Sequence, residues 1–301
     1  MIRRLGWGLP MSSSTPPPRI AIVGDVCIDE NVIDGQHTLT WGSSAAYISH
    51  YLHRHDGIDS AIVAPYARDF LHCADGLTLV DPPRDGASLR YENIVAADRR
   101  VQYCHGATEN VPGALSSAAR AAIAAANILF VTPLTPLMPH EYVASVIQAT
   151  SPGCLTVLLP QGYMRRCDAD GLVHQSALGR AERLLSLFDL VVLSDEDYPD
   201  AVRRAQSWQR HAPRTNLVVT QNKRGATLVG PDGLTHVPTR PLTEGERVSP
   251  VGAGDTFSAA LALALFTGEP VTEAIATAHR AVIISPECAV TGTHSAVTPT
   301  P

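Results

Sequence analysis

The sequence predicts an α/β fold in which helices flank a doubly wound, mostly parallel sheet. Short apolar runs, of the kind that form strands buried on both faces, recur along the chain and alternate with segments of helical periodicity. Such alternation is typical of a parallel sheet that helices cover on both sides. Neither an internal repeat nor a long linker divides the chain, so one domain is expected over residues 19–301.

The N-terminal part supplies the first strand–helix–strand unit. Residues 1–18 lack the apolar stretch of a signal peptide and end in a serine- and proline-rich segment, so a disordered leader is expected, with Met11 as an alternative start. A strand is predicted over residues 19–25, where an apolar run stops at Gly-Asp, and it is followed by a helix over 44–54 and a strand over 60–64.

A small β-element is expected to interrupt this pattern. Residues 88–95 and 100–104 alternate between apolar and polar side chains roughly every two positions, as half-exposed strands do, with a turn near Asp98 between them. Two insertions, near 26–42 and near 86–105, are therefore predicted to form a β-lid.

Strands and helices alternate again over the rest of the chain. An alanine-rich helix is predicted over residues 116–126, and apolar helices over residues 256–267 and 272–284 come last. Between them, strands are predicted over 128–131, 155–159, 190–193 and 217–220, and helices around 140–149, 176–187 and 198–211.

The composition excludes several classes of protein. Charged residues make up 17% of the chain and the formal net charge is −6, so a basic surface for nucleic acid is not expected. No apolar run reaches the roughly 18 residues that a membrane helix needs. The single lysine, Lys223, lies outside any Gly-Lys-Ser/Thr sequence, which excludes a P-loop. The 6 cysteines form no Cys-x-x-Cys pair, which is typical of reduced thiols in a cytoplasmic protein.

The most informative segment for function is residues 251–261, where a glycine-rich turn leads directly into an apolar helix. The glycines allow the backbone to approach an anion closely, and the free N–H groups at the helix start favour negative charge. With an ordinary pKa of about 4, Asp255 is expected to be ionised at neutral pH and able to accept a proton from an attacking hydroxyl. The local sequence equally permits a plain turn in which Asp255 is the helix N-cap.

The sequence Gly-Ala-Gly-Asp, followed by a helix of small residues, resembles the C-terminal signature of ribokinase-like kinases of the PfkB family. The resemblance extends over the chain from about residue 19. It implies that the backbone of Gly252, Ala253 and Gly254 forms an anion hole, and that Asp255 is the catalytic base and contacts the substrate.

Other segments resemble the substrate and nucleotide sites of that family. Asp29, at the exit of the first strand, matches the aspartate that binds substrate hydroxyls. Further substrate contacts are implied for Gly42, Ser43 and Ala46, where the family has its hinge and the start of a helix. Nucleotide contacts are implied for Ser194, Thr220, Asn222, Gly225, Gly252, Gly254 and His279.

The chain also departs from the family pattern. Where the family has Asn-x-x-Glu, this chain has Ser194 and Asp197, so Asp197 or the adjacent Glu196 is expected to reach magnesium only through water. The second hinge glycine is absent, and Ala46 takes the place of a sugar-binding asparagine. Ser249 stands where many members have an aspartate near a monovalent cation, so weak or absent potassium activation is expected.

The resemblance implies an enzyme that transfers the γ-phosphate of ATP to a hydroxyl of a sugar or sugar-like molecule, with ATP and Mg²⁺ as cofactors. A cyclitol or nucleoside kinase of the same fold is one alternative. The segment Ala45-Ala46-Tyr47, which lacks the sugar-binding asparagine, resembles inositol kinases more than ribokinases. A non-catalytic ligand-binding relative is the other. The expected partners are small molecules and neither nucleic acid nor membrane, and the β-lid is the expected surface for a homodimer.

Overall fold

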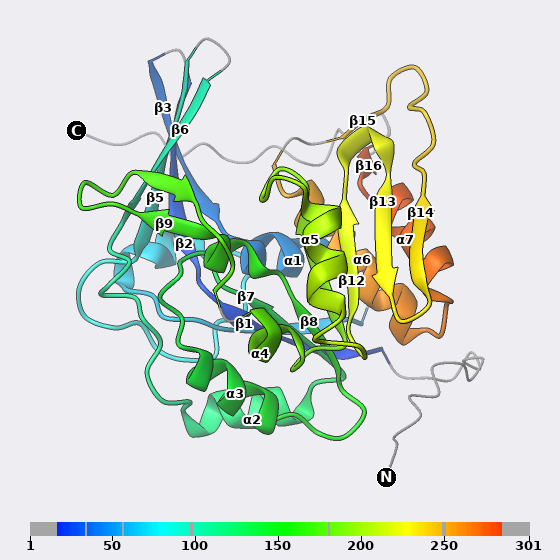
Figure 1. Ribbon diagram of the computed structural model, residues 1–301. Helices are drawn as coiled ribbons and strands as arrows, with labels where there is room; N and C mark the ends of the chain where they lie inside the picture. Colours follow the sequence, from blue (N-terminus) through cyan, green and yellow to red (C-terminus); the bar gives the residue numbers. More distant parts are fainter. Residues whose placement is uncertain are drawn as a thin grey trace.

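The computed structural model describes residues 17–33, 35–55, 57–96, 99–179, 181–248 and 251–284 (Figure 1). Its centre is an eight-stranded sheet with the order β14-β13-β12-β11-β8-β7-β1-β4. The strands are β1 (Arg19–Gly24), β4 (Asp59–Val63), β7 (Ile128–Thr132), β8 (Leu155–Leu158), β11 (Leu190–Ser194), β12 (Asn216–Thr220), β13 (Ala226–Gly230) and β14 (Gly233–Val237). Nearly all of the expected leader, together with Asp98 and Ser249, lies outside the described residues.

This large sheet is mostly parallel, as predicted. β1 pairs in parallel with β4 and β7, and the parallel ladder continues through β8 and β11 to β12. β13 and β14 extend the sheet by antiparallel pairing and were not predicted. Pro231 and Asp232 connect these two strands ahead of Gly233, and Pro-Asp-Gly is a typical turn sequence.

Helices cover both faces of the large sheet, which confirms the doubly wound arrangement. In β1, Ile20 and Ile22 pack into one apolar cluster, whereas Ala21 and Val23 pack into the other on the opposite face. Both faces of β1 are buried, which explains why all four of these residues are apolar. The first cluster includes α1 (Ser44–Leu52), α6 (Ala253–Phe266) and α7 (Val271–Ala281); the second includes α2 (Ser117–Ala125), α3 (His140–Gln148), α4 (Ala181–Leu185) and α5 (Ala201–Gln209).

The two predicted insertions pair with each other in a second sheet, called the small sheet below. Its strands, in the order β3-β2-β5-β6, are β2 (Cys27–Ile33), β3 (Gln36–Gly42), β5 (Leu89–Ala96) and β6 (Arg99–His105). β2 begins soon after β1 ends, so the small sheet rises from the carboxyl edge of the large sheet (Figure 1).

The helix predicted over residues 176–187 is shorter in the structure. Only α4 is helical there, and a hairpin of β9 (Arg165–Cys167) and β10 (Val173–Gln175) precedes it. The last predicted helix ends early as well, because Ile283–Ile284 forms strand β16 against β15 (Arg247–Val248). Three short 3₁₀ segments complete the elements: η1 (Arg68–Cys73), η2 (Pro160–Met164) and η3 (Asn222–Arg224). Within the described residues, no helix has the length and apolar character to cross a membrane.

The close approach of β1 to β7 depends on a glycine at the end of β1. A Cβ atom at Gly24 would overlap both the side chain and the carbonyl group of Thr132, its partner residue in β7. Because two strand backbones form this contact, neither side can yield cheaply.

We expect Gly24→Ala to lower the free energy of unfolding by about 1–3 kcal/mol, the usual cost of overpacking. Urea denaturation of the purified protein measures the change. Gly113→Ala is the matched control, since a Cβ atom there would meet no atom within 4 Å. Equal denaturation midpoints for the two variants would show that β1 and β7 can separate freely at this point.

Candidate active site

A cavity of about 280 Å³ lies at the edge of the large sheet where β11 and β12 end. The start of α6 and the base of the small sheet form its other walls. Open parallel sheets bind ligands at this carboxyl edge. Of the residues predicted for the site, those that line the cavity are Asp29, Ser43, Ser194, Glu196, Asp197, Thr220, Asn222, Gly252, Ala253, Gly254 and Asp255.

The N-terminus of α6 presents bare backbone to the cavity. Gly252 has a φ of 76°, and a Cβ atom on it would overlap the ring of Tyr47. Both the backbone conformation and the close contact therefore require glycine. A Cβ atom on Gly254 would meet no atom within 4 Å, because that position faces open space. The first N–H groups of a helix have no intrahelical acceptor, so this end can bind an anion.

Asp255 lies in the first turn of α6 and lines the cavity. Burial raises the pKa of its carboxyl to about 6, against the opposing effects of a hydrogen bond with Ser44 and the charge of Arg165. The Asp197 carboxylate raises the pKa as well. The ordinary pKa expected from the sequence is therefore corrected upward, although roughly 90% of such a group is still ionised at pH 7.

Asp29 reaches the same cavity from β2 of the small sheet. The Cys27 thiol donates a hydrogen bond to Oδ1 of Asp29 at 3.3 Å. A Cβ atom on Gly42 would overlap the Asp29 carboxylate. Gly42 does not line the cavity, but its lack of a side chain makes room for the carboxylate that does.

Ser43 lies at the junction of β3 and α1 and holds a conformation that favours glycine. Its φ is 104° and its ψ is 148°, a combination that costs a non-glycine residue on the order of 1–3 kcal/mol. The Ser43 hydroxyl accepts a hydrogen bond from the N–H of Ala46 at 3.2 Å and so caps α1. Ala46 itself is fully buried in the core and does not line the cavity.

The residues predicted to contact the nucleotide and magnesium form a hydrogen-bonded rim at the ends of β11 and β12. The N–H of Ser194 donates to Oδ2 of Asp197 at 3.0 Å, and the Ser194 hydroxyl accepts from the N–H of Glu196 at 3.1 Å. The side-chain amide of Asn222 donates to the Glu196 carboxylate at 2.8 Å. Thr220 lies beside Ser194 in the paired strands and completes the rim.

A magnesium ion fits this rim only if phosphate and water supply most of its ligands. Within the described residues, no three His, Cys, Asp or Glu side chains form a group that could hold a metal. Both oxygens of Asp197 accept hydrogen bonds, from Ser194 and from Gln161, and burial raises the pKa of its carboxyl. Glu196 is exposed, so it is the carboxylate better able to hold magnesium-bound water.

Gly225 and His279 lie apart from the cavity lining. Gly225 has a φ of 106°, and a Cβ atom on it would overlap the Val237 carbonyl at the end of β14. His279 is 8% exposed, lies 5.1 Å from the ring of Phe257 and forms a hydrogen bond with the Val237 backbone. Burial lowers the pKa of His279, and its Nε2 atom has no hydrogen-bond partner among the described residues.

Arg165 and Gln161 line the cavity but were not predicted from the sequence. Arg165 is the only basic residue among the described residues of the lining, and its guanidinium carbon lies 5.4 Å from the centre of the Tyr91 ring. Both residues follow the end of β8, and ligand residues gather where parallel strands end. That position was the available signal for them.

A buried carboxylate next to the cavity organises the segment after β7. Oδ2 of Asp25 accepts hydrogen bonds from the N–H groups of Leu134 at 2.7 Å and Thr135 at 3.3 Å. Burial raises the pKa of Asp25 to about 6. The Leu134 carbonyl then accepts from the Tyr91 hydroxyl at 2.7 Å and from Nη1 of Arg165 at 3.4 Å.

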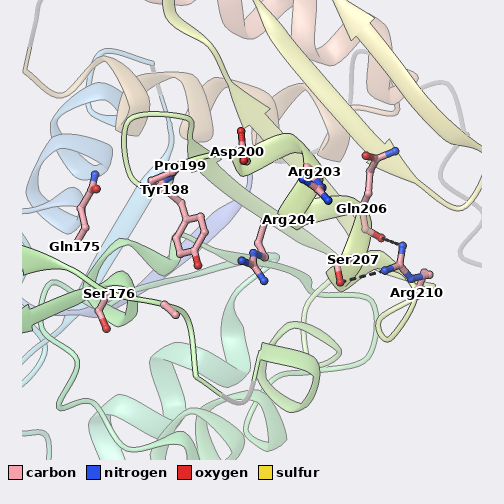
Figure 2. A pocket seen from close by; sticks show the side chains of 11 residues that line it. Gln175, Ser176, Tyr198, Pro199, Asp200, Arg203, Arg204, Gln206, Ser207 and Arg210 are labelled. Carbon is pink, nitrogen blue, oxygen red and sulfur yellow. Dashed lines mark hydrogen bonds between the residues drawn. The ribbon is translucent and has the colours of Figure 1, made fainter.

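A separate groove of about 980 Å³ lies between β10 and α5 (Figure 2). It is lined by three arginines, Arg203, Arg204 and Arg210, and by one carboxylate, that of Asp200. Arg204 lies over the Tyr198 ring with its guanidinium carbon 5.3 Å from the ring centre. None of the predicted site residues lines this groove, so the smaller cavity is the candidate active site.

Residues 92–293, which include the whole α6 motif, match the family described as pfkB family carbohydrate kinase. The chain belongs to this family. Among similar proteins, the inositol 3-kinase of Zea mays is 34% identical over 128 residues, which cover 40% of this chain. The match spans 31% of the maize protein, about a third of its length.

Solved structures of ribokinase-family enzymes share the fold. A pyrophosphate-dependent kinase complexed with a pyrophosphate analog and myo-inositol superposes with a TM-score of 0.67 at 17% identity, over 86% of this chain and 92% of that one. The Arabidopsis thaliana ribokinase complexed with ribose and ATP gives 0.63 at 15% identity, over 92% and 94%. The pfkB chain therefore has a ribokinase-like α/β fold.

Asp255→Asn should make the protein more stable at high pH. Because the folded-state pKa of Asp255 is raised from 3.8 to about 6, its ionisation costs stability as the pH rises through that window. At pH 8 the gain in unfolding free energy should reach at most about 3 kcal/mol, and it should shrink as the pH approaches 4. Urea denaturation of both proteins across this range measures the difference.

Asp232→Asn is the matched control, because Asp232 lies exposed in the turn between β13 and β14. That variant should follow the wild-type protein at every pH. If Asp255→Asn were no more stable than the wild type at pH 8, the ionised carboxylate would not be strained by its burial.

Proposed function

We propose that this chain is a kinase that transfers the γ-phosphate of ATP to a hydroxyl of a sugar or a cyclitol. One observation carries the proposal: a single cavity contains the open N-terminus of α6, the Asp255 carboxylate beside it, and Asp29 from the small sheet. An anion site next to a general base, with a second carboxylate to orient the acceptor, is what phosphoryl transfer to a hydroxyl needs.

The acceptor end of the cavity orients the substrate. Asp29 accepts hydrogen bonds from substrate hydroxyl groups, and the position of its carboxylate is fixed by Cys27 and Gly42. Asp255 then accepts the proton of the attacking hydroxyl. With a pKa near 6 it is mostly ionised at neutral pH, yet basic enough to take part in proton transfer.

The donor end stabilises the charge of the transferred group. The N–H groups at the start of α6 and the guanidinium of Arg165 neutralise the phosphoryl oxygens. Magnesium, when bound, supplies further positive charge to the phosphates, through water held by Glu196. Closure of the small sheet over the cavity excludes water, which suppresses hydrolysis of the donor. The same small sheet is the proposed homodimer surface, and the proposed location is the cytoplasm.

A cyclitol is the acceptor class that the comparisons favour. The maize relative is an inositol 3-kinase, and a similar fold has been solved with myo-inositol. Ala46, in place of an asparagine, is buried and offers no side chain for sugar binding.

Pyrophosphate is the second candidate for the donor. A similar structure is that of a pyrophosphate-dependent kinase. The start of α6 lines the cavity, whereas Gly225 and His279, both expected to contact the nucleotide, do not. ATP stays the first candidate, because the similar Arabidopsis thaliana ribokinase was solved with ribose and ATP.

A panel of donors and acceptors tests the proposed function. Purified protein with Mg²⁺ is given ATP or pyrophosphate together with one sugar, cyclitol or nucleoside. We expect ADP release that depends on the acceptor, greatest with a cyclitol, and a phosphorylated product in the mass spectrum. If product forms with pyrophosphate and an acceptor but not with ATP and an acceptor, pyrophosphate is the donor and the proposal of ATP is wrong. No product with any pair would favour the non-catalytic ligand-binding alternative.

The two carboxylates of the cavity should fail in different ways. Asp255→Asn should lower kcat by about 10²–10⁴ without weakening donor binding, since this is the usual contribution of a positioned base. Asp29→Ala should raise KM for the acceptor and leave KM for the donor unchanged. Steady-state kinetics with each substrate varied in turn separate the two effects.

Asp232→Asn, remote from the cavity, is the control for both variants and should keep wild-type kinetics. Wild-type turnover by Asp255→Asn would exclude Asp255 as the base. A parallel loss of donor affinity in Asp29→Ala would exclude Asp29 as an acceptor-specific residue.

A further inference from the structure

Two cysteines that the proposed mechanism does not use meet beside the cavity. Cys104 lies on β6 and Cys167 on β9, and both pack in the apolar cluster that contains Tyr91. The N–H of Cys104 donates to the carbonyl of Gly171, in the β9–β10 turn, at 2.8 Å. Both side chains also line the same groove. The pair therefore joins the small sheet to the strand that carries Arg165.

The two thiols differ in access and in ionisation. Both line an open groove of about 1110 Å³, but Cys104 is only 5% exposed whereas Cys167 is half-buried. Interaction with the Cys104 thiol lowers the pKa of Cys167 to about 7, and Arg165 and His174 act in the same direction. The same interaction, together with burial, raises the pKa of Cys104. Cys167 is thus the accessible thiolate and Cys104 its protonated neighbour.

We propose that Cys167 is a modification site, oxidised by hydrogen peroxide, and that Cys104 is the resolving thiol that closes a disulfide with it. The observation that carries this proposal is that one accessible and one buried thiol, from β9 and from the small sheet, pack in one apolar cluster and line one groove.

The chemistry balances with peroxide as the only oxidant. The Cys167 thiolate attacks one oxygen of peroxide, the O–O bond breaks, and a sulfenic acid and hydroxide form. Cys104 then attacks the Cys167 sulfur, the S–O bond breaks, and the departing hydroxide takes the Cys104 proton as water. In total, two thiols and one peroxide give one disulfide and two water molecules.

Such a disulfide would tie β6 of the small sheet to β9. Arg165 lies two residues before Cys167 on the same strand, and its side chain lines the candidate active site. A fixed small sheet cannot open to exchange substrate and product, so turnover should fall. This consequence rests on the proposed kinase function, whereas formation of the disulfide does not.

Other described cysteines provide internal comparisons. Burial raises the pKa of Cys73 and Cys154, the latter to about 12. Cys27 is buried, its pKa is raised well above the ordinary value by burial, and its thiol donates to Asp29. Since the thiolate is the nucleophile, these residues should react with peroxide far more slowly than Cys167.

The test is peptide mapping of the full chain after peroxide treatment. All proteins carry Cys288→Ser, because Cys288 lies outside the described residues. Trypsin cleaves at Arg100 and Arg120 around one cysteine and at Arg166 and Arg180 around the other, so the pair falls in two separate peptides. We expect the two peptides to be joined, with a mass two hydrogen atoms below the sum of the two reduced peptides. Treatment with dithiothreitol should separate them.

Variants identify the role of each thiol. Cys167→Ser should abolish the joined peptides, and Cys104→Ser should leave a sulfenic acid on Cys167 that dimedone captures. Cys73→Ser is the matched control and should form the disulfide at the wild-type rate. At pH 7, alkylation of Cys167 should be at least about tenfold faster than that of Cys73, since the pKa of Cys167 is lowered whereas that of Cys73 is raised.

Absence of the joined peptides in the wild-type protein would overturn the proposal, whatever the kinase activity. Joined peptides that contain Cys27 instead of Cys104 would overturn the assignment of the resolving thiol. A reduced protein without kinase activity would bear only on the proposed function. In an active protein, oxidation should lower turnover reversibly in the wild type and not in Cys104→Ser.

Discussion

The buried carboxylate of Asp25 is the interaction on which the geometry of the cavity depends. It satisfies two N–H groups of the segment after β7, and the Leu134 carbonyl thereby accepts hydrogen bonds from Tyr91 and Arg165. Without this acceptor, each buried N–H group would cost about 1–3 kcal/mol. Asp25 follows Gly24 directly, so the tight approach of β1 to β7 also brings the carboxylate to the segment that it holds.

Two features of the cavity wall lower the stability of the folded protein, and packing elsewhere in the fold must compensate for them. Ser43 holds a φ of 104° at the start of α1, and the carboxyl of Asp255 is kept where burial opposes its charge. Two apolar clusters, one on each face of the large sheet, supply the stability that tolerates these costs. Strain confined to a cavity wall is typical of sites shaped for chemistry and not for stability.

The large sheet could be predicted because strands buried on both faces leave a continuous apolar signal, as in β1. The part of the candidate site at the start of α6 could be predicted because Gly252 and Asp255 lie only three positions apart in the sequence. Local pattern failed where contacts between distant segments decide the structure. The β9–β10 hairpin is stabilised by the hydrogen bond between Cys104 and Gly171, which the residues near 176–187 do not reveal. The pKa of Asp255 and the neighbourhood of Arg165 likewise depend on segments far away in the chain.

The hydroxyl of Tyr91 joins the small sheet to the Leu134 carbonyl by one neutral hydrogen bond. A bond of this kind contributes about 1 kcal/mol, which by itself would favour the latched arrangement only about fivefold over an unlatched one. The hydrogen bond from Cys104 to the Gly171 carbonyl is a second polar link, so the small sheet is tied to the rest of the cavity by contacts that are each individually weak. The timescale of such collective motion, microseconds to milliseconds, is also well within the range of relaxation-dispersion spectroscopy.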